Sequence, residues 1–250
     1  MHPPFHSRIA RGFTLVELLV VVAIVSALAA LLVPALGTIS NGGGMSSAVT
    51  GISGLLEQAR AYSMGNNTYV YVGIQEVNAI SSNSVPAASG TGQLVIAVVA
   101  SQNGTRPYTT LATTPITPSL VNPGIGMIDK IHSFAGVHLV SPSAAMNGPN
   151  MTGRPTATSA SVVDISKATA TTTFQWPFTG APNYSFNKVI EFDPQGVARV
   201  QQGSAYSASV SDYLEITLVA THGNAAVATA ADQAAIQVDG ITGAVRFYRP

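Results

Sequence analysis

The longest apolar stretch of the chain lies near its N-terminus, where Leu18 to Leu36 form nineteen residues without a charge. As a helix at about 1.5 Å per residue, this stretch would be roughly 28 Å long, close to the ~30 Å hydrocarbon core of a bilayer. Residues 1–12 before it carry Arg8 and Arg11 and no acidic residue. The pattern predicts one membrane-spanning helix, and the positive-inside rule places residues 1–12 in the cytoplasm and the rest of the chain outside.

Glu17 distinguishes this segment from an ordinary signal anchor and from an ordinary secretory signal peptide. An uncleaved signal anchor, or a secretory signal peptide cut near Ala35 to Gly37, would explain the apolar run. Neither has a use for a carboxylate at the start of the helix, which costs about 2.5–3.5 kcal/mol at the middle of a bilayer and less near its surface. An ionisable residue at that place indicates a functional site that needs a partner.

Residues Gly12 to Glu17, with the sequence GFTLVE, and the apolar run after them resemble the prepilin cleavage and methylation motif of type IV pilin-like proteins. The resemblance implies that a prepilin peptidase cuts after Gly12 and methylates the new amine of Phe13. It also implies that Glu17 neutralises the N-terminal amine of a neighbouring subunit during assembly. An ammonium and a carboxylate that are each costly in lipid become tolerable as a pair.

Two features after the motif bear on the helix. Pro34, twenty-one residues after Phe13, stands where many pilins place a helix-bending proline, and a proline inside a helix typically costs about 3 kcal/mol. Residues 37–44 end in three consecutive glycines, which predict a break and a flexible joint at the membrane surface. No Gly-Lys-Ser or Gly-Lys-Thr follows, so a phosphate-binding loop is not favoured.

Beyond residue 44 the pattern becomes amphipathic. Apolar residues with a 4-3-4-3 spacing predict a helix that packs on a sheet, with Glu57 and Arg60 on its wet side: Met45, Val49, Ile52, Leu56 and Ala59. Tyr69 to Ile74 is rich in β-formers and predicts the first strand.

Residues 76–186 are the least regular part of the chain. Clusters of Ser, Thr, Asn, Gly and Pro predict loops at Ser81 to Gly92 and Pro142 to Thr158, whereas Leu94 to Val99 and Val137 to Val140 indicate short strands. We expect this region to be an insertion that decorates one edge of the sheet.

The C-terminal part predicts two hairpins and one longer strand. Val189 to Phe192 and Val197 to Val200 flank Asp193-Pro194-Gln195-Gly196, which has the residues of a type I turn in order. Ile236 to Asp239 and Ala244 to Tyr248 form the second pair. Between them, Leu214, Ile216 and Leu218 alternate with Tyr213, Glu215 and Thr217, as expected of a half-buried strand.

Together these elements predict an α+β fold, with an N-terminal helix packed on antiparallel sheets. Residues 45–75 and 187–249 resemble the GspH/FimT branch of minor pilins and pseudopilins, in which a helix with an Ala-Arg signature, here Ala59-Arg60, leads through Asn residues into a strand. The sequence thus divides into a leader (1–12), a transmembrane assembly helix (13–36), a Gly-rich joint (37–44) and a globular domain (45–250) with its insertion at about 76–186.

The composition of the chain excludes several kinds of chemistry and disfavours some partners. The chain has no cysteine, which excludes disulfides and thiolate chemistry. Its charges balance at eleven basic and eleven acidic residues, and loss of Arg8 and Arg11 with the leader leaves nine against eleven, so nucleic acid is not a favoured partner. His132, His138 and Asp129 lack the spacing of a metal site, and no Gly-x-Ser-x-Gly elbow is present. We therefore expect no enzymatic activity, no metal and no cofactor.

The resemblances imply a minor pseudopilin that supports protein secretion by a type II secretion-like machine. The alternative is a minor subunit of a type IV pilus with an outward role in adhesion or DNA uptake. The implied partners are other pilin subunits, prepilin peptidase, an inner-membrane assembly platform and the lipid bilayer. The implied location is the bacterial inner membrane, crossed once, with the globular domain in the periplasm and the assembled subunit in a periplasmic or surface fibre.

Overall fold

The computed structural model describes residues 15–81, 84–106, 124–142, 151, 153–155, 162–168, 174–176, 183–202, 205–206, 210–226 and 233–249. The chain divides into two compact units, Met1–Ser40 and Asn41–Pro250. The first contains the start of the single long helix, and the second contains the end of that helix and all described strands.

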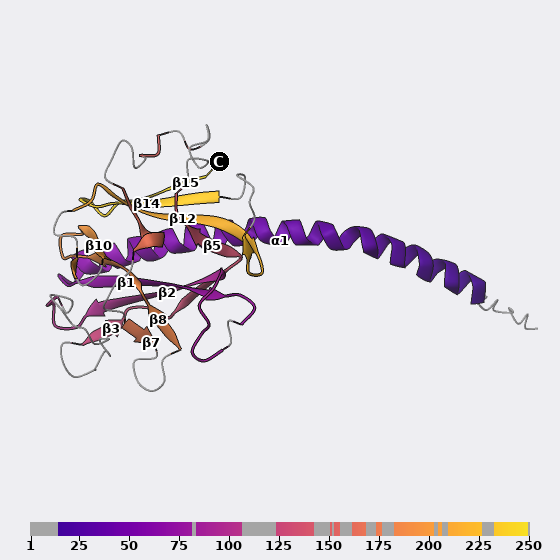
Figure 1. Cartoon of the computed structure of the whole chain (residues 1–250), viewed down its shortest axis with the longest axis horizontal. Coiled ribbons are helices and arrows are strands. Elements are labelled where there is room, and N and C mark those ends of the chain that lie inside the picture. The colour runs from indigo at the N-terminus through magenta and orange to yellow at the C-terminus, as the bar shows by residue number, and fades with distance from the viewer. Residues whose placement is uncertain are drawn as a thin grey trace, which may run out of the picture. The chain divides into compact units, whose positions relative to one another are not determined.

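Helix α1 runs from Leu15 to Gly65 and includes residues 37–44, so the helix break expected from the three glycines is not present in the backbone (Figure 1). Each glycine costs about 1 kcal/mol relative to alanine, but helix propagation is cooperative and good helix formers lie on both sides. The boundary between the two compact units nevertheless falls within this stretch, after Ser40.

The amphipathic half of α1 follows its sequence pattern. All five apolar residues of the predicted stripe, from Met45 to Ala59, are buried, whereas Glu57 is exposed. Gly51 belongs to the same face, because a Cβ atom there would lie 2.4 Å from a ring carbon of Phe134. The helix thus presents an apolar stripe with one gap that admits an aromatic ring.

The first sheet has the order β11-β10-β9-β1-β2-β3, with β4 also paired to β2, and all of its pairs are antiparallel. Its strands are β1 (Val70–Asn78), β2 (Gly92–Ser101), β3 (Ile125–Met127), β4 (His132–Ala135), β9 (Lys188–Phe192), β10 (Ala198–Gln202) and β11 (Ala205–Tyr206).

The second sheet has the order β13-β12-β14-β15, with β5 and β6 paired to β12, and only the β6 pairing is parallel. Its strands are β5 (Val137–Val140), β6 (Val162–Asp164), β12 (Tyr213–His222), β13 (Ala225–Ala226), β14 (Gln233–Asp239) and β15 (Val245–Tyr248). A short 3-10 helix, η3 (Ile165–Lys167), follows β6, and β7 (Phe174–Trp176) and β8 (Tyr184–Phe186) form a separate antiparallel pair.

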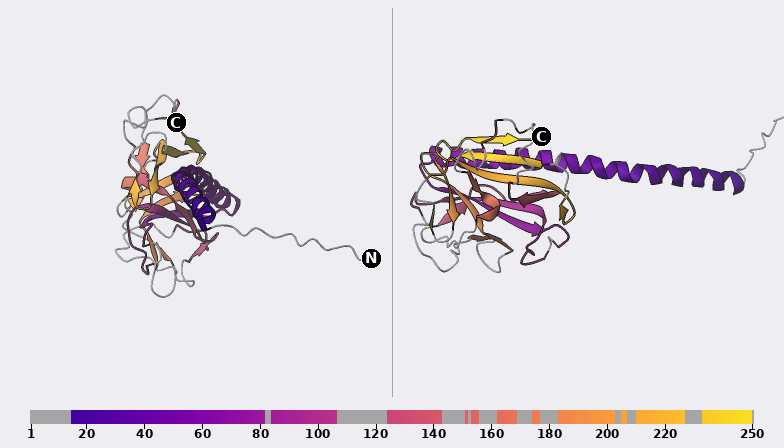
Figure 2. Two further views of the ribbon diagram at one scale, coloured as in Figure 1. Left: turned by 90° about the vertical axis from the view of Figure 1, so that its right-hand side faces the viewer. Right: turned by 45° about the horizontal axis from the view of Figure 1, so that its top comes forward.

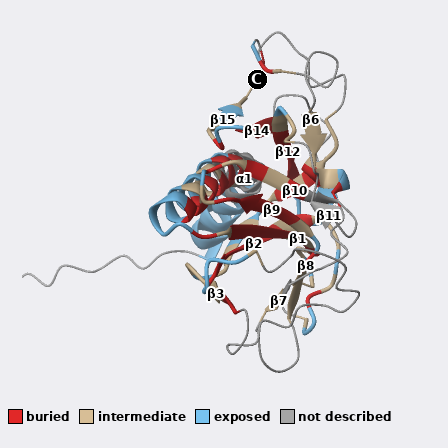
Figure 3. Ribbon diagram, turned by 90° about the vertical axis from the view of Figure 1, so that its left-hand side faces the viewer, coloured by how far each residue is buried: buried red, intermediate tan, exposed pale blue. Residues whose placement is uncertain are grey.

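The main core lies between the amphipathic half of α1 and both sheets. It contains alternate residues of β1, β2 and β12, such as Val72, Ile96 and Ile216, packed with Ile52 and Leu56 of the helix. Both views of Figure 2 show this part of α1 beside strands of the two sheets, and Figure 3 shows buried residues concentrated where α1 meets β1 and β2. The α+β fold predicted from the sequence is confirmed.

A second apolar cluster covers the opposite face of the first sheet. Tyr71, Val95 and Val99 point to this side and pack with Phe186 of β8. Because both faces are covered, β1 and β2 are buried along most of their length.

Several local predictions can be compared with these strands. Both C-terminal hairpins are present, and the first closes with the Gly196 amide donating to the carbonyl oxygen of Asp193 at 2.8 Å, with Gly196 at a φ of +81°. The region 76–186 does not simply decorate one edge: β2 pairs with every residue of β1 inside the first sheet, and β5 and β6 pair with β12 of the second.

The expectation of a half-buried β12 is wrong. Residues Leu214 to Thr221 are all buried, including Glu215 and Thr217 on the face expected to be wet. The physical reason is that Arg154 and Pro155 contact side chains on that face, and Arg154 supplies a partner for the carboxylate, as described below.

Candidate functional site

The first turns of α1 expose apolar side chains on every side. The ten large ones between Leu15 and Leu28 are 49–80% exposed: Leu15, Val16, Leu18, Leu19, Val20, Val21, Val22, Ile24, Val25 and Leu28. At 100° per residue these positions cover the whole circumference of the helix. A helix that is apolar all round is stable when other helices or lipid surround it.

Two polar side chains lie within this apolar segment. Glu17 stands in the first turn of α1, where a carboxylate is favoured by the positive end of the helix dipole. The Ser26 hydroxyl donates to the carbonyl oxygen of Val22 at 2.7 Å, which satisfies it inside the helix itself. The segment therefore presents Glu17 as its one ionisable group between residues 15 and 28.

The residues predicted for processing are placed only in part. Glu17 and Pro34 both lie within the helical backbone of α1. Gly12 and Phe13, the two sides of the predicted cleavage site, lie outside the described residues. Among the helices of the described part, none combines the length and hydrophobicity needed to cross a membrane.

A buried polar network lies on the outer face of β12. Arg154 and Glu215 form an ion pair with side chains 3% and 0% exposed, in which the Arg154 Nε donates to Glu215 Oε2 at 3.1 Å. Thr217 donates to the same carboxylate at 2.9 Å and Gln237 at 2.6 Å. Gln237 also donates to the carbonyl oxygen of Pro155 at 2.8 Å, so the network joins Arg154 and Pro155 to β12 and β14.

A second buried carboxylate lies on β9. Glu191 is fully buried and accepts from Arg106 Nε at 2.9 Å and from Arg106 Nη2 at 2.6 Å. The guanidinium also lies 5.9 Å from the centre of the Tyr69 ring. Burial raises the pKa of Glu191, and the Arg106 guanidinium opposes that rise.

The histidines have carboxylate partners of their own. His132 Nε2 lies 2.9 Å from Asp129 Oδ2, and this hydrogen bond lowers the pKa of Asp129. His138 Nδ1 lies 2.5 Å from Glu76 Oε1. His132 and His138 are not brought together with a further ligand, and no set of three metal-ligating side chains occurs among the described residues.

Sequence reasoning missed both arginine–carboxylate pairs. Glu191 is flanked by Val189, Ile190 and Phe192 in β9, and Glu215 is flanked by Leu214 and Ile216 in β12. A carboxylate between apolar strand residues could have predicted a buried ion pair, because a buried charge requires a partner of opposite charge. The partners themselves come from loops, at Arg106 and Arg154, and the strand patterns do not identify them.

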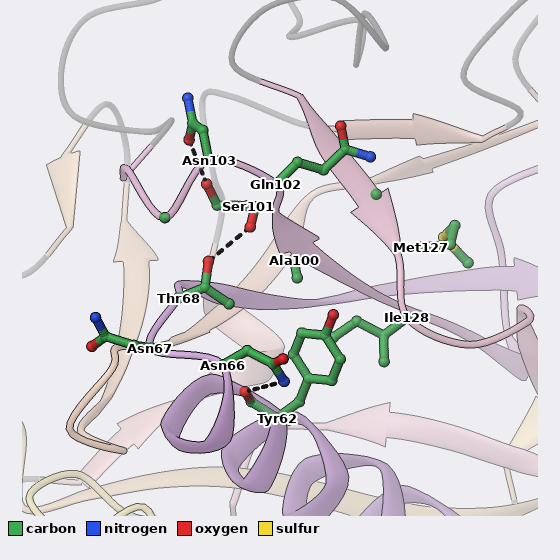
Figure 4. Close-up of a pocket in the computed structure, with 12 residues that line it drawn as sticks. Tyr62, Asn66, Asn67, Thr68, Ala100, Ser101, Gln102, Asn103, Met127 and Ile128 are labelled. Atoms are coloured by element: carbon green, nitrogen blue, oxygen red, sulfur yellow. Dashed lines mark hydrogen bonds between the residues drawn. The ribbon is translucent and has the colours of Figure 1, made fainter.

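An open polar hollow of about 720 Å³ lies at the C-terminal end of α1, between the turn into β1, the end of β2 and strand β3 (Figure 4). Asn66, Asn67, Gln102 and Asn103 contribute four carboxamides to its lining, and Tyr62 contributes a phenol ring.

Comparison with known proteins identifies one segment. Residues 7–33 match the family described as the prokaryotic N-terminal methylation motif. No curated protein and no solved structure matches the chain. The matched residues include Gly12, Phe13 and Glu17, so the motif implies a pilin-like subunit that is processed by a prepilin peptidase and assembles with other subunits.

Proposed function

We propose that this chain is a minor pseudopilin, cut after Gly12, methylated on Phe13 and assembled into a fibre through its N-terminal helix. The observation that carries the proposal is the methylation motif at residues 7–33 combined with exposed apolar side chains on every side of α1 between Leu15 and Leu28. The motif also suggests a structural subunit and not an enzyme.

Glu17 is the proposed assembly residue. Cleavage after Gly12 would create an ammonium at Phe13, and both this ammonium and the Glu17 carboxylate are costly in an apolar environment. When helices of neighbouring subunits pack side by side, the carboxylate of one can neutralise the ammonium of the next. The apolar surface between residues 15 and 28 provides the surrounding contact, and the charge pair sets the register between helices.

The N-terminal segments have distinct proposed roles. Residues 1–12 form the leader, residues 13–36 the helix that holds the precursor in the inner membrane, and residues 45–250 the globular domain. Two arginines and no acid in the leader favour a cytoplasmic N-terminus, which leaves the globular domain in the periplasm. Pro34 is the proposed bend, and residues 37–44 are the proposed joint, since glycine lowers the cost of local unwinding.

A secretion pseudopilus is the favoured fibre. The proposal rests on the resemblance of residues 45–75 and 187–249 to the GspH/FimT branch, and the partners would be other pseudopilins, the peptidase and an inner-membrane assembly platform. A surface pilus with a role in DNA uptake is less well supported, because removal of the leader leaves nine basic against eleven acidic residues.

Intact-mass and N-terminal analysis of the membrane-fraction protein tests processing. The full chain is expressed with and without a prepilin peptidase. A product that begins at N-methylated Phe13 only in the presence of the peptidase is expected. A chain that still begins at Met1, or one that begins near Gly37, contradicts the proposal.

A secretion assay distinguishes a secretion pseudopilus from a surface pilus. In a host that lacks this chain, export of secreted enzymes into the medium is expected to fall and to return with the wild-type gene. The Glu17→Ala variant should not restore export although it is cleaved. Unchanged export together with lost surface fibres would favour the pilus alternative.

A further inference from the structure

We propose that the polar hollow at the C-terminal end of α1 binds a neutral oligosaccharide, through the carboxamides of Asn67 and Gln102 and the ring of Tyr62. This goes beyond the role of the chain as a fibre subunit, because it assigns a ligand to the globular unit. The hollow has about 720 Å³, within the ~300–1,000 Å³ of small-molecule sites.

The carboxamides offer both donors and acceptors to a ligand. Asn66 uses its Nδ2 to donate to the carbonyl oxygen of Tyr62 at 3.1 Å, which leaves its Oδ1 as an acceptor. Asn103 uses its Oδ1 to accept from Ser101 and Thr105, which leaves its Nδ2 as a donor. Asn67 and Gln102 are exposed, and neither side chain hydrogen-bonds to another described residue. Sugar hydroxyls both donate and accept, so this set of groups matches them.

The ring of Tyr62 supplies an apolar wall. It is 37% exposed and rises from α1 into the hollow, with Ile128 beside it (Figure 4). Aromatic rings combine an apolar face with a polar tip, and the C–H face of a pyranose packs on such a surface. The hollow therefore has one stacking face and a set of amides around it, an arrangement suited to a ring that is apolar on its faces and polar at its edge.

Hydrogen bonds to the backbone fix the frame of the hollow. The Thr68 hydroxyl donates to the carbonyl oxygen of Ser101 at 2.7 Å, and the Ser101 amide donates to the carbonyl oxygen of Tyr69 at 2.8 Å. Asn67 adopts a φ of +49°, the left-handed conformation of a helix C-cap, and the Thr68 amide closes that cap by donating to the carbonyl oxygen of Ser63 at 3.0 Å. The cap fixes the backbone that carries the Asn67 carboxamide in the lining of the hollow.

Charge argues for a neutral ligand. No charged side chain lines the hollow among the described residues. An ionic ligand would lose water without meeting a counter-charge. A peptide is less well matched, since its side chains would need apolar pockets or unpaired strand edges, and most of this lining is polar.

The experiment uses the full chain in detergent micelles. It is screened against an array of neutral and anionic oligosaccharides, with maltotriose, cellotriose and chitotriose as defined probes, and against a peptide library. Titration calorimetry then compares the best probe with three pocket variants: Gln102→Ala, Asn67→Gly and Tyr62→Leu. Glycine is chosen at position 67 because it keeps the positive φ. The matched control is Gln58→Ala, which removes an exposed carboxamide of α1 outside the hollow.

Binding of a neutral oligosaccharide is expected, with about a tenfold weaker Kd in each pocket variant, equivalent to roughly one lost hydrogen-bonding or stacking contact. The Gln58→Ala variant should bind within about twofold of the wild type. No oligosaccharide binding, binding that pocket variants leave unchanged, or binding only to anionic sugars or only to peptides would each overturn the proposal. The mass analysis of the mature N-terminus is independent of this result, so the two proposals can fail separately.

Discussion

Arg154 and Glu215 form an ion pair in which neither side chain has meaningful access to water, although one comes from a loop and the other from the central strand of the second sheet. The carboxylate has further donors in Thr217 and Gln237. Full hydrogen bonding of this kind makes a buried pair tolerable, but it also makes the loss of either partner costly.

Removing the cation is therefore expected to destabilise the fold. The Arg154→Met variant leaves the Glu215 charge buried without its partner and should lower the free energy of unfolding by about 3–5 kcal/mol. Urea unfolding of the full chain in micelles measures the change. The control is Lys167→Ala, because Lys167 is 75% exposed, lies 3.7 Å from Asp164 and should matter by less than about 1 kcal/mol. Equal effects of the two substitutions would contradict the reasoning.

Glu191 gives stability a pH dependence. Burial raises its pKa in the folded state above the ordinary value of 4.5. At a pH between this ordinary pKa and the raised pKa, the folded state binds more protons than the unfolded state. The stability contributed by this group is complete below pH 4.5 and is lost as pH rises through the folded-state pKa. Unfolding free energies measured from pH 4 upward should thus fall less steeply in the Glu191→Gln variant than in the wild type. Parallel pH profiles would show that the folded and unfolded pKa values of Glu191 do not differ.

Two glycines of α1 form a matched pair. Gly54 has nothing within 4 Å of an added Cβ, so Gly54→Ala should raise the free energy of unfolding by about 0.5–1 kcal/mol through helix propensity alone. At Gly51 the Cβ would lie 2.4 Å from the Phe134 ring, and Gly51→Ala should gain less or lose stability. Thermal unfolding of both variants tests this. In a Phe134→Leu background the two substitutions should become similar, and a persistent difference would point to another cause.

Assembly should depend on the charge of Glu17 and not on its shape. The Glu17→Gln variant is expected to be cleaved normally but to be at least about tenfold less abundant in sheared or cross-linked fibres, since an amide cannot neutralise the Phe13 ammonium. Glu57→Gln, an exposed carboxylate later in the same helix, is the control. Normal incorporation of the Glu17→Gln variant into fibres would contradict the proposed role of Glu17 in assembly.

The sequence patterns identified those elements whose burial depends on local periodicity. The stripe from Met45 to Ala59 and the hairpin around Asp193 to Gly196 were predictable, because helix period and turn chemistry act within a few residues. The full burial of β12 was not, because the cover over Glu215 comes from Arg154, sixty-one positions away in the chain. The hollow beside Tyr62 was likewise not predictable, since its amides come from two turns that only the tertiary fold brings together.

The pairing of β5 and β6 with β12 also limits the order in which the strands can pair during folding. These two strands lie within residues 137–164, but among the described residues the strand that they pair with begins at Tyr213, so this pairing cannot form until that part of the chain has been made. Contacts over such sequence separations form slowly, because loop closure must precede any gain from pairing. The apolar stripe of α1 packs against residues of both sheets, so it is fully covered only after β12 and β14 have been made, and part of it stays exposed during synthesis and export until then.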